Sequence, residues 1–250
     1  MIVKEVSGAI GAIIQGVHLD KNLHENTISK IYDVFLKYQA IFFKNQKLTP
    51  EILISFAKKI GRPISYPFVK GLDSFPEITP ILKKETDINN FGGIWHSDTT
   101  YQNEPPKCTM LYALEVPNFG GDTEFSNQYL AYESLSDEMK LFLDKKKAVN
   151  ISAKSEVTKS RSDVLKHSAL DMKNNTLEAI HPVIRIHPET KKKSLYINEA
   201  HTTHFVGMSK EESKPILKKL FKHQVNPKFT CRFKWKKGSV AIWDNRCTLH

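Results

Sequence analysis

Apolar residues recur with two different spacings along the 250-residue chain. Residues 25–38 place them three or four positions apart, which predicts a helix. Thr49-Pro50 supplies a capping hydroxyl and a first-turn proline for a second helix, which Gly61 ends. Residues 2–19 alternate apolar and small side chains around glycines, as a hairpin does. The first quarter of the chain therefore predicts two helices and several strands, including a buried strand at Ala40–Lys44.

After Gly61 the pattern changes to short apolar runs separated by turn residues, which predicts strands. These runs are Glu77–Leu82, Cys108–Val116, Asp122–Phe125, His181–His187, Ser194–Asn198, Lys228–Trp235 and Ser239–Trp243. Two helical stretches interrupt them, Leu130–Leu143 and Lys210–His223. Many short strands with few helices predict a mostly β antiparallel sandwich or barrel with flanking helices.

We expect one domain over residues 1–250, because no internal repeat or Gly/Ser/Pro linker divides the chain. Residues 151–176 are polar and weakly patterned, and we interpret them as a lid or flexible insert over a site. The expected location is a reducing cytoplasm, since the three cysteines are scattered and the N-terminus lacks the pattern of a signal peptide.

Composition narrows the range of partners. Hydrophobic residues make up 40% and charged residues 26%, as in a soluble globular protein. The net charge is +10, but only five of the 37 basic residues are arginine, the usual reader of guanine edges and phosphates. We therefore expect a solvated basic surface and no nucleic-acid partner. No apolar run reaches the roughly 18 residues of a membrane span, so no membrane partner is expected either.

Candidate chemistry lies in the segment Phe91–Tyr101, where His96 and Asp98 are two residues apart. In an extended strand such residues point to the same face, so the pair would offer two adjacent metal ligands. A second histidine would complete a two-histidine, one-carboxylate set with open positions for a redox iron. His-x-Asp is also a common surface pair. The apolar strand Ser239–Trp243 runs into a polar cluster that ends on His250, and a jelly roll brings such distant strands together.

Several motifs in order resemble the TauD/TfdA family of Fe(II)- and 2-oxoglutarate-dependent dioxygenases over nearly the whole chain. They are Trp95-His-Ser-Asp98, Gly120-Gly-Asp-Thr123, Ala131-Tyr-Glu-Ser-Leu135, His181-Pro-Val, Tyr196-Ile-Asn-Glu199, Gly207-Met-Ser, and Trp243-Asp-Asn-Arg246 ahead of His250. The resemblance implies a double-stranded β-helix, or jelly roll. It implies a single oxidoreductase domain that uses Fe(II), 2-oxoglutarate and O2.

The resemblance also implies roles for particular residues. His96, Asp98 and His250 would hold the iron, and the Thr123 hydroxyl would donate to the distal carboxylate of 2-oxoglutarate. The substrate would be a small anionic organic acid (a sulfonate, a sulfate ester or an aryloxy or carboxylic acid), hydroxylated with release of succinate and CO2. Candidate pocket residues are Tyr66, Tyr101 and His201. Taurine itself is not expected, because the positions that bind it in relatives carry other residues here.

The chain departs from the family pattern at its end. Family members continue past the last iron histidine into a further strand, whose arginine pairs with 2-oxoglutarate. Residues 1–250 stop at His250, so this strand is missing from them, and we expect a fragment with weak 2-oxoglutarate binding and little turnover. Arg246 is expected to be structural rather than a substitute.

Two other classes of function stay open on sequence alone. The same ligand set could hold zinc and activate water in a metal-dependent hydrolase. A degenerate family member could instead act as a basic binding module. The sequence does not decide whether the chain forms a homo-oligomer.

Overall fold

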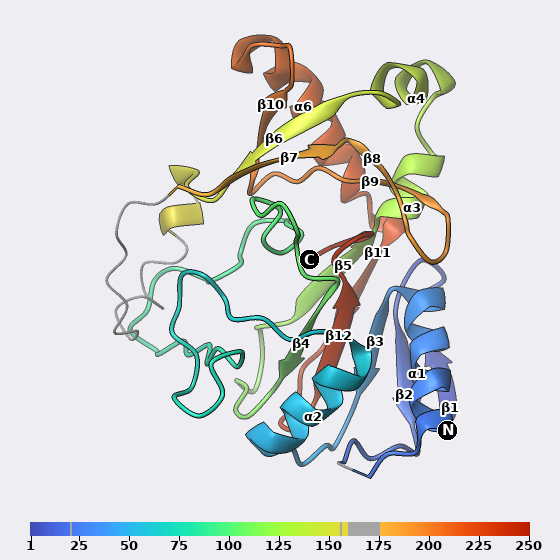
Figure 1. The fold of residues 1–250 in the computed structure, drawn as a ribbon, viewed down its shortest axis with the longest axis vertical. Helices are drawn as coiled ribbons and strands as arrows, with labels where there is room; N and C mark the ends of the chain where they lie inside the picture. Colours follow the sequence, from blue (N-terminus) through green and yellow to red (C-terminus); the bar gives the residue numbers. More distant parts are fainter. Residues whose placement is uncertain (21, 156, 160–175) are drawn as a thin grey trace.

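The computed structural model describes residues 1–20, 22–155, 157–159 and 176–250 (Figure 1). One sheet has five strands in the order β1-β2-β3-β12-β4, and a second has three in the order β11-β5-β13. Their bounds are β1 Ile2–Glu5, β2 Ala12–Gln15, β3 Ala40–Phe43, β4 Cys108–Tyr112, β5 Thr123–Asn127, β11 Thr230–Phe233, β12 Val240–Asp244 and β13 Thr248–Leu249. Only the β2–β3 pair among them is parallel.

A third sheet and a hairpin lie on the other side of the molecule from α2 (Figure 1). The sheet has the order β10-β6-β7, and the hairpin joins β8 to β9. Their bounds are β6 Lys147–Ile151, β7 Glu178–Pro182, β8 Ile184–Ile186, β9 Lys193–Leu195 and β10 Thr202–Phe205. The helices with both ends in the described residues are α1 Glu25–Tyr38, α2 Pro50–Ile60, α3 Gln128–Glu133, α4 Asp137–Leu143 and α6 Lys210–Gln224, with a short 3₁₀ helix at Pro227–Phe229.

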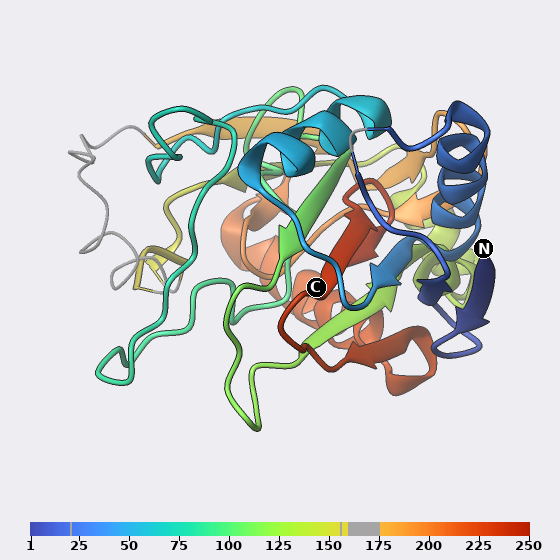
Figure 2. The ribbon, with the colours of Figure 1, turned by 90° about the horizontal axis from the view of Figure 1, so that it is seen from below.

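Strands β3 and β12 form the centre of the five-stranded sheet and are buried on both faces. Successive side chains of a strand point to opposite faces. Ile41 and Phe43 accordingly pack against α1 and α2, whereas Phe42 packs against the second sheet. The Phe42 ring stacks on Phe233 of β11, with centroids 4.1 Å apart. The layers are therefore helices, five-stranded sheet and three-stranded sheet, as Figure 2 shows from below.

The helix termini follow the expected capping chemistry. Thr49 accepts a hydrogen bond from the Ile52 N–H at the start of α2. Ser209 and Glu212 form a reciprocal capping box on α6. Helix α6 then packs with α4, β6, β9 and β10 around a separate apolar core.

The mostly β class with flanking helices is confirmed, but two local predictions were wrong and two strands were not predicted. Glu77–Leu82 forms no strand: Pro80 cannot donate to a ladder, and Leu82 is half exposed. The single helix expected at Leu130–Leu143 is two helices, because Ser136 caps the start of α4. Strands β6 and β10 were missed, since their mixed polar and apolar residues give no clear alternation.

Two further expectations were a lid at residues 151–176 and the absence of a membrane-spanning segment. The lid expected at 151–176 falls largely on residues 156 and 160–175, which lie outside the described residues. Across the described ranges, the helices are all too short or too polar to cross a bilayer.

The three cysteines carry free thiols and are shielded to different extents. Cys231 is buried in the core between the two sheets, and Cys108 is half-buried in β4. Burial raises the pKa of Cys108 to about 11 and that of Cys231 to about 12. Burial likewise raises the pKa of Cys247, in the turn between β12 and β13, well above its ordinary value. All three thiols are therefore protonated at neutral pH.

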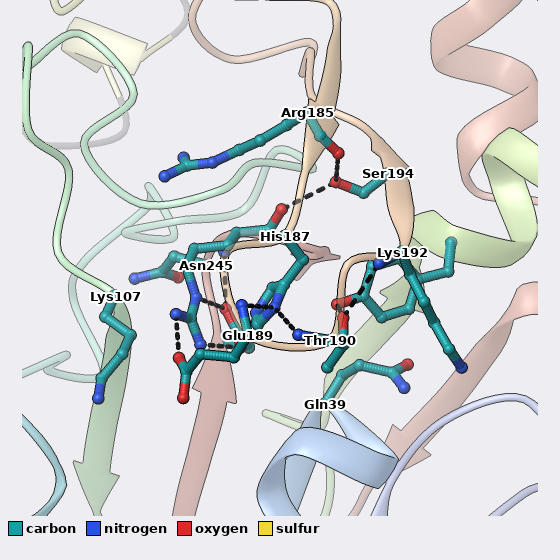
Figure 3. A network of polar contacts seen from close by, with 12 residues as sticks. Gln39, Lys107, Arg185, His187, Glu189, Thr190, Lys192, Ser194 and Asn245 are labelled. Atoms are coloured by element: carbon teal, nitrogen blue, oxygen red, sulfur yellow. Dashed lines mark hydrogen bonds and ion pairs between the residues drawn. The ribbon is translucent and has the colours of Figure 1, made fainter.

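The turn between β12 and β13 holds a buried ion-pair network (Figure 3). Arg246 binds the Asp244 carboxylate through two nitrogens, at 2.6 and 2.7 Å, and Glu189 at 2.6 Å. His187 Nε2 lies 3.1 Å from Asp244 Oδ2, the oxygen that also accepts from Arg246 Nη2. Burial alone would raise the pKa of Asp244, but the hydrogen bonds from Arg246 and His187 lower it. Arg246 thus joins this turn to the β8–β9 hairpin, in agreement with the structural role expected from sequence.

We expect Arg246→Ala to destabilise the fold by about 3 kcal/mol or more, because it leaves Asp244 buried without its cationic partner. Arg232→Ala is the matched control, since Arg232 pairs with Glu124 in β5 but its side chain is 61% exposed. The control should lose less than about 1 kcal/mol. Denaturant unfolding gives the free energy of unfolding of both variants. Equal decreases would contradict the assignment of Arg246 as the buried residue that joins Asp244 to Glu189.

Candidate metal centre

The main chain brings two distant segments together at the candidate centre. His96 precedes β4, and His250 follows β13, which pairs with β5. The His96 N–H donates to the His250 carbonyl at 3.0 Å, and the His250 N–H donates back at 2.9 Å. Two residues that exchange both bonds form one hydrogen-bonded pair of an antiparallel ladder. The C-terminus consequently lies inside the molecule in both views (Figures 1 and 2).

The side chains of His96, Asp98 and His250 converge, as the sequence predicted. Their ligand atoms all lie within 4.8 Å of one another. His96 Nε2 is 3.4 Å from Asp98 Oδ1, and His250 Nε2 is 3.5 Å from Asp98 Oδ2. The expected regular strand at His96 is absent, because Asp98 already begins a turn. The turn nevertheless directs both side chains of the His-x-Asp motif to the same point.

The donor atoms fit a metal ion. His96 Nδ1 lies 2.7 Å from the Ile94 carbonyl, so Nδ1 carries the proton and Nε2 presents its lone pair to the cluster. Within the described ranges, His250 Nε2 is buried and has no hydrogen-bond partner. Buried polar atoms are nearly always paired. An unpaired imidazole nitrogen facing a carboxylate and a second imidazole is therefore suited to a metal with nitrogen and oxygen ligands.

Electrostatics also suit the ligand set. Burial alone would raise the pKa of Asp98, but the neighbouring His250 and His96 hold it well below its ordinary value. Burial, assisted by His96, lowers the pKa of His250. The charged carboxylate and neutral imidazole are the forms that bind metals.

Packing fixes the two imidazole rings. The His250 ring lies 4.5 Å from Trp243 and 6.2 Å from Phe125, measured between centroids. On the other side, Gly92 has a φ of +73° that favours glycine, and a Cβ there would lie 3.3 Å from His96 Cε1. The backbone therefore approaches the His96 ring closely, and a side chain at position 92 would press on it.

Thr123 lies at the start of β5, on the same face as Phe125 two residues later. Since the Phe125 ring stacks on His250, this face looks toward the cluster. The Thr123 hydroxyl oxygen accepts a hydrogen bond from Trp235 Nε1 at 2.9 Å. The indole N–H can only donate, so the hydroxyl hydrogen of Thr123 is left to donate to another acceptor.

The predicted pocket residues belong to a row of aromatic rings in contact, which begins at His96. The row, called the aromatic wall below, consists of His201, Tyr101, Phe68, Tyr66 and Phe91. The His96 and His201 centroids are 6.2 Å apart, and those of His201 and Tyr101 are 4.9 Å apart. Phe68 links Tyr101 to Tyr66 and was missed from sequence, although its spacing of two residues from Tyr66 is a signal for it.

A second group, His187, Asp244 and Cys247, also has metal-binding residue types in close proximity. Its polar atoms already have partners. Both Asp244 oxygens accept from Arg246 or His187. His187 Nδ1 accepts from two backbone N–H groups of the β8–β9 hairpin, at 3.0 and 3.2 Å. This group is therefore structural, in contrast to the unpaired His250 nitrogen.

The chain is similar to proteins of known class over almost all of its length. Residues 3–250 match the model of the family described as "Taurine catabolism dioxygenase TauD, TfdA family". An alkylsulfatase from Acinetobacter baylyi is 33% identical, with 99% of this chain and 78% of that protein covered. An alpha-ketoglutarate-dependent sulfate ester dioxygenase from Pseudomonas putida is 31% identical, with 99% and 82% covered.

Comparison with solved structures indicates the same family. The crystal structure of a taurine dioxygenase from Burkholderia xenovorans superposes with a TM-score of 0.82 at 32% identity, covering 99% of this chain and 81% of that one. The predicted jelly-roll fold and the predicted class of enzyme, a 2-oxoglutarate-dependent dioxygenase, are confirmed, and a hydrolase or binding module is not favoured. The chain belongs to the TauD/TfdA family.

Proposed function

We propose that this dioxygenase acts on an organic sulfate ester and that His96, Asp98 and His250 hold its Fe(II). The observation that carries the metal assignment is the buried His250 Nε2, which has no hydrogen-bond partner in the described residues and faces Asp98 and His96. When bound, Fe(II) with 2-oxoglutarate activates dioxygen for hydroxylation of a substrate C–H bond. Hydroxylation of the carbon that bears the sulfate gives an unstable product, which releases an aldehyde and sulfate. The balance is RCH₂OSO₃⁻ + 2-oxoglutarate + O2 → RCHO + HSO₄⁻ + succinate + CO2.

The chain's own residues supply binding and orientation. The two imidazoles and Asp98 would hold the metal, a ligand set suited to iron that also binds a cosubstrate. The Thr123 hydroxyl donates to the distal carboxylate of 2-oxoglutarate, because Trp235 fixes its oxygen and leaves its hydrogen available. The aromatic wall bounds the organic part of the substrate and limits the access of water.

The sulfate-ester class rests on two observations. The alkylsulfatase and the sulfate ester dioxygenase are 33% and 31% identical to almost the whole chain. The aromatic wall extends from His96 to the partly exposed rings of Tyr66, Phe68 and Phe91, and such rings suit a hydrocarbon chain better than the short polar chain of taurine. A reducing compartment, the cytoplasm, is proposed for the protein in agreement with its three free thiols.

Substitution of a ligand should abolish tight metal binding. We expect Asp98→Ala and His250→Ala each to raise the Kd for Fe(II), measured by anaerobic titration of apoprotein, by a hundredfold or more. Loss of a group that only supports a ligand costs about 10–100-fold, and loss of a ligand should cost at least that. His18→Ala is the control, since His18 is exposed and lies outside the cluster. Unchanged binding in Asp98→Ala would overturn the ligand assignment.

The reaction is tested with a medium-chain alkyl sulfate and with taurine. We expect inorganic sulfate and succinate in equal amounts from the alkyl sulfate, at a rate at least about tenfold above the taurine rate. The assay uses 2-oxoglutarate in excess. Asp98→Ala gives the background. Faster sulfite release from taurine would replace the proposed substrate class, and sulfate release without 2-oxoglutarate would contradict the reaction type.

Thr123 is tested through cosubstrate binding alone. Anaerobic addition of 2-oxoglutarate to the Fe(II) protein should give the weak visible charge-transfer band of an iron–2-oxo-acid chelate. We expect Thr123→Val to need about tenfold more 2-oxoglutarate for half of this band, because a hydrogen bond to a charged group contributes about 1.5–3 kcal/mol. Thr123→Ser keeps the hydroxyl and should stay within about threefold of the parent. Equal titrations for the Val and Ser variants would remove this role from Thr123.

A further inference from the structure

The Asp98 carboxylate has a polar partner that neither the motif nor the ligand set includes. Thr109, in β4, donates its hydroxyl to Asp98 Oδ2 at an O···O distance of 2.5 Å. Oδ1 lies 3.4 Å from His96 Nε2 and Oδ2 lies 3.5 Å from His250 Nε2, so Oδ2 alone has the hydroxyl contact in addition to an imidazole neighbour. The two oxygens of this ligand are therefore in different environments. Each oxygen faces one imidazole nitrogen of the cluster, but only Oδ2 is also held by a residue of the sheet.

Asn245 fixes the direction of the Thr109 hydrogen bond. Asn245 Nδ2 lies 3.3 Å from the Pro106 carbonyl and 2.9 Å from Thr109 Oγ1. A carbonyl oxygen only accepts, so the amide must present its NH₂ group to both atoms. Thr109 Oγ1 then accepts from Asn245, and its own hydrogen points to Asp98.

Asn245 and Thr109 are themselves held in place by other hydrogen bonds. The Asn245 N–H donates to the Lys107 carbonyl at 3.0 Å, and the Ser97 hydroxyl donates to the Asn245 carbonyl at 2.6 Å. Thr109 is held by the pairing of β4 with β12, opposite Trp243. Asp98, by contrast, sits in a turn outside the named strands. Thr109 and Asn245, which are held by the sheet and the residues beside it, thus fix the side chain of Asp98, whose own backbone lies in a turn.

We propose that Thr109, oriented by Asn245, is a positioning residue that engages Asp98 Oδ2 and so makes Oδ1 the single metal-binding oxygen of Asp98. A carboxylate that binds through one oxygen uses one coordination position, which keeps the others for 2-oxoglutarate and dioxygen. Without the Thr109 hydroxyl, Oδ2 is free to turn toward the metal or away from it. This inference rests on the proposed function, since it takes His96, Asp98 and His250 as the metal ligands.

The test uses Co(II) as the probe, added anaerobically to apoprotein, and reads affinity and visible spectrum without turnover. We expect Thr109→Val to raise the Co(II) Kd by about 10–100-fold, the range for loss of an outer partner of a ligand. Its d–d bands should also differ from those of the parent, because the carboxylate no longer binds through a fixed oxygen. Thr109→Ser, which keeps the hydroxyl, should match the parent in both readouts. Thr109→Ala replaces the Val variant if the latter fails to fold.

Asn245 provides an independent arm, because it acts through Thr109. Asn245→Ala should weaken Co(II) binding in the parent but add little in the Thr109→Val background, as expected for two residues in one chain of contacts. Parent-like Co(II) affinity and spectrum in Thr109→Val would overturn the inference while leaving the proposed function intact. Failure of the parent itself to bind Co(II) or Fe(II) would instead overturn the ligand assignment.

Discussion

The reciprocal main-chain pair between His96 and His250 is the contact on which the candidate centre depends. It sets the last residue of the chain beside the His-x-Asp turn and fixes the separation of the two imidazoles before any metal is considered. Strand β13 pairs with β5 immediately before this contact, so the three-stranded sheet fixes the position of His250. A ligand set assembled from segments far apart in sequence is in this way held by ordinary ladder geometry.

The turn between β12 and β13 serves both sides of the fold. On one side, Asp244 and Arg246 fix the β8–β9 hairpin through Glu189. Glu189 also accepts from the Tyr32 hydroxyl of α1. On the other side, the Asn245 amide reaches Thr109 and, through it, Asp98. The side chains of Asp244 and Arg246 thus contact the β8–β9 hairpin, whereas the side chain of Asn245 between them contacts Thr109. One short sequence motif therefore has two structural roles: it holds the β8–β9 hairpin, and it orients the residue that binds Asp98.

Sequence alone predicted the parts of the structure that depend on local chemistry. Helix α1, the Thr49 cap and the buried strand at β3 follow from periodicity and capping residues. The spacing of His96 and Asp98 predicted that their side chains meet, and the strand that leads to His250 together with the family resemblance added the third residue of the cluster. Strands β6 and β10 could not be found, because their burial comes from packing against each other and α6 rather than from their own pattern. Thr109 and Asn245 could not be recognised as site residues, since each gains its role only from a contact made across the fold. Phe68 had a signal in its spacing of two residues from Tyr66, which was not used.

The shielding of the thiols has a consequence for an enzyme that handles dioxygen next to a reduced metal. Such chemistry releases oxidising species whenever it runs without capturing a substrate, and the thiolate is the form of cysteine that they attack. Cys108, Cys231 and Cys247 all have pKa values raised by burial, so almost none of their sulfur is thiolate at neutral pH. Burial therefore keeps these cysteines in the thiol form, which is less susceptible to oxidation than the thiolate.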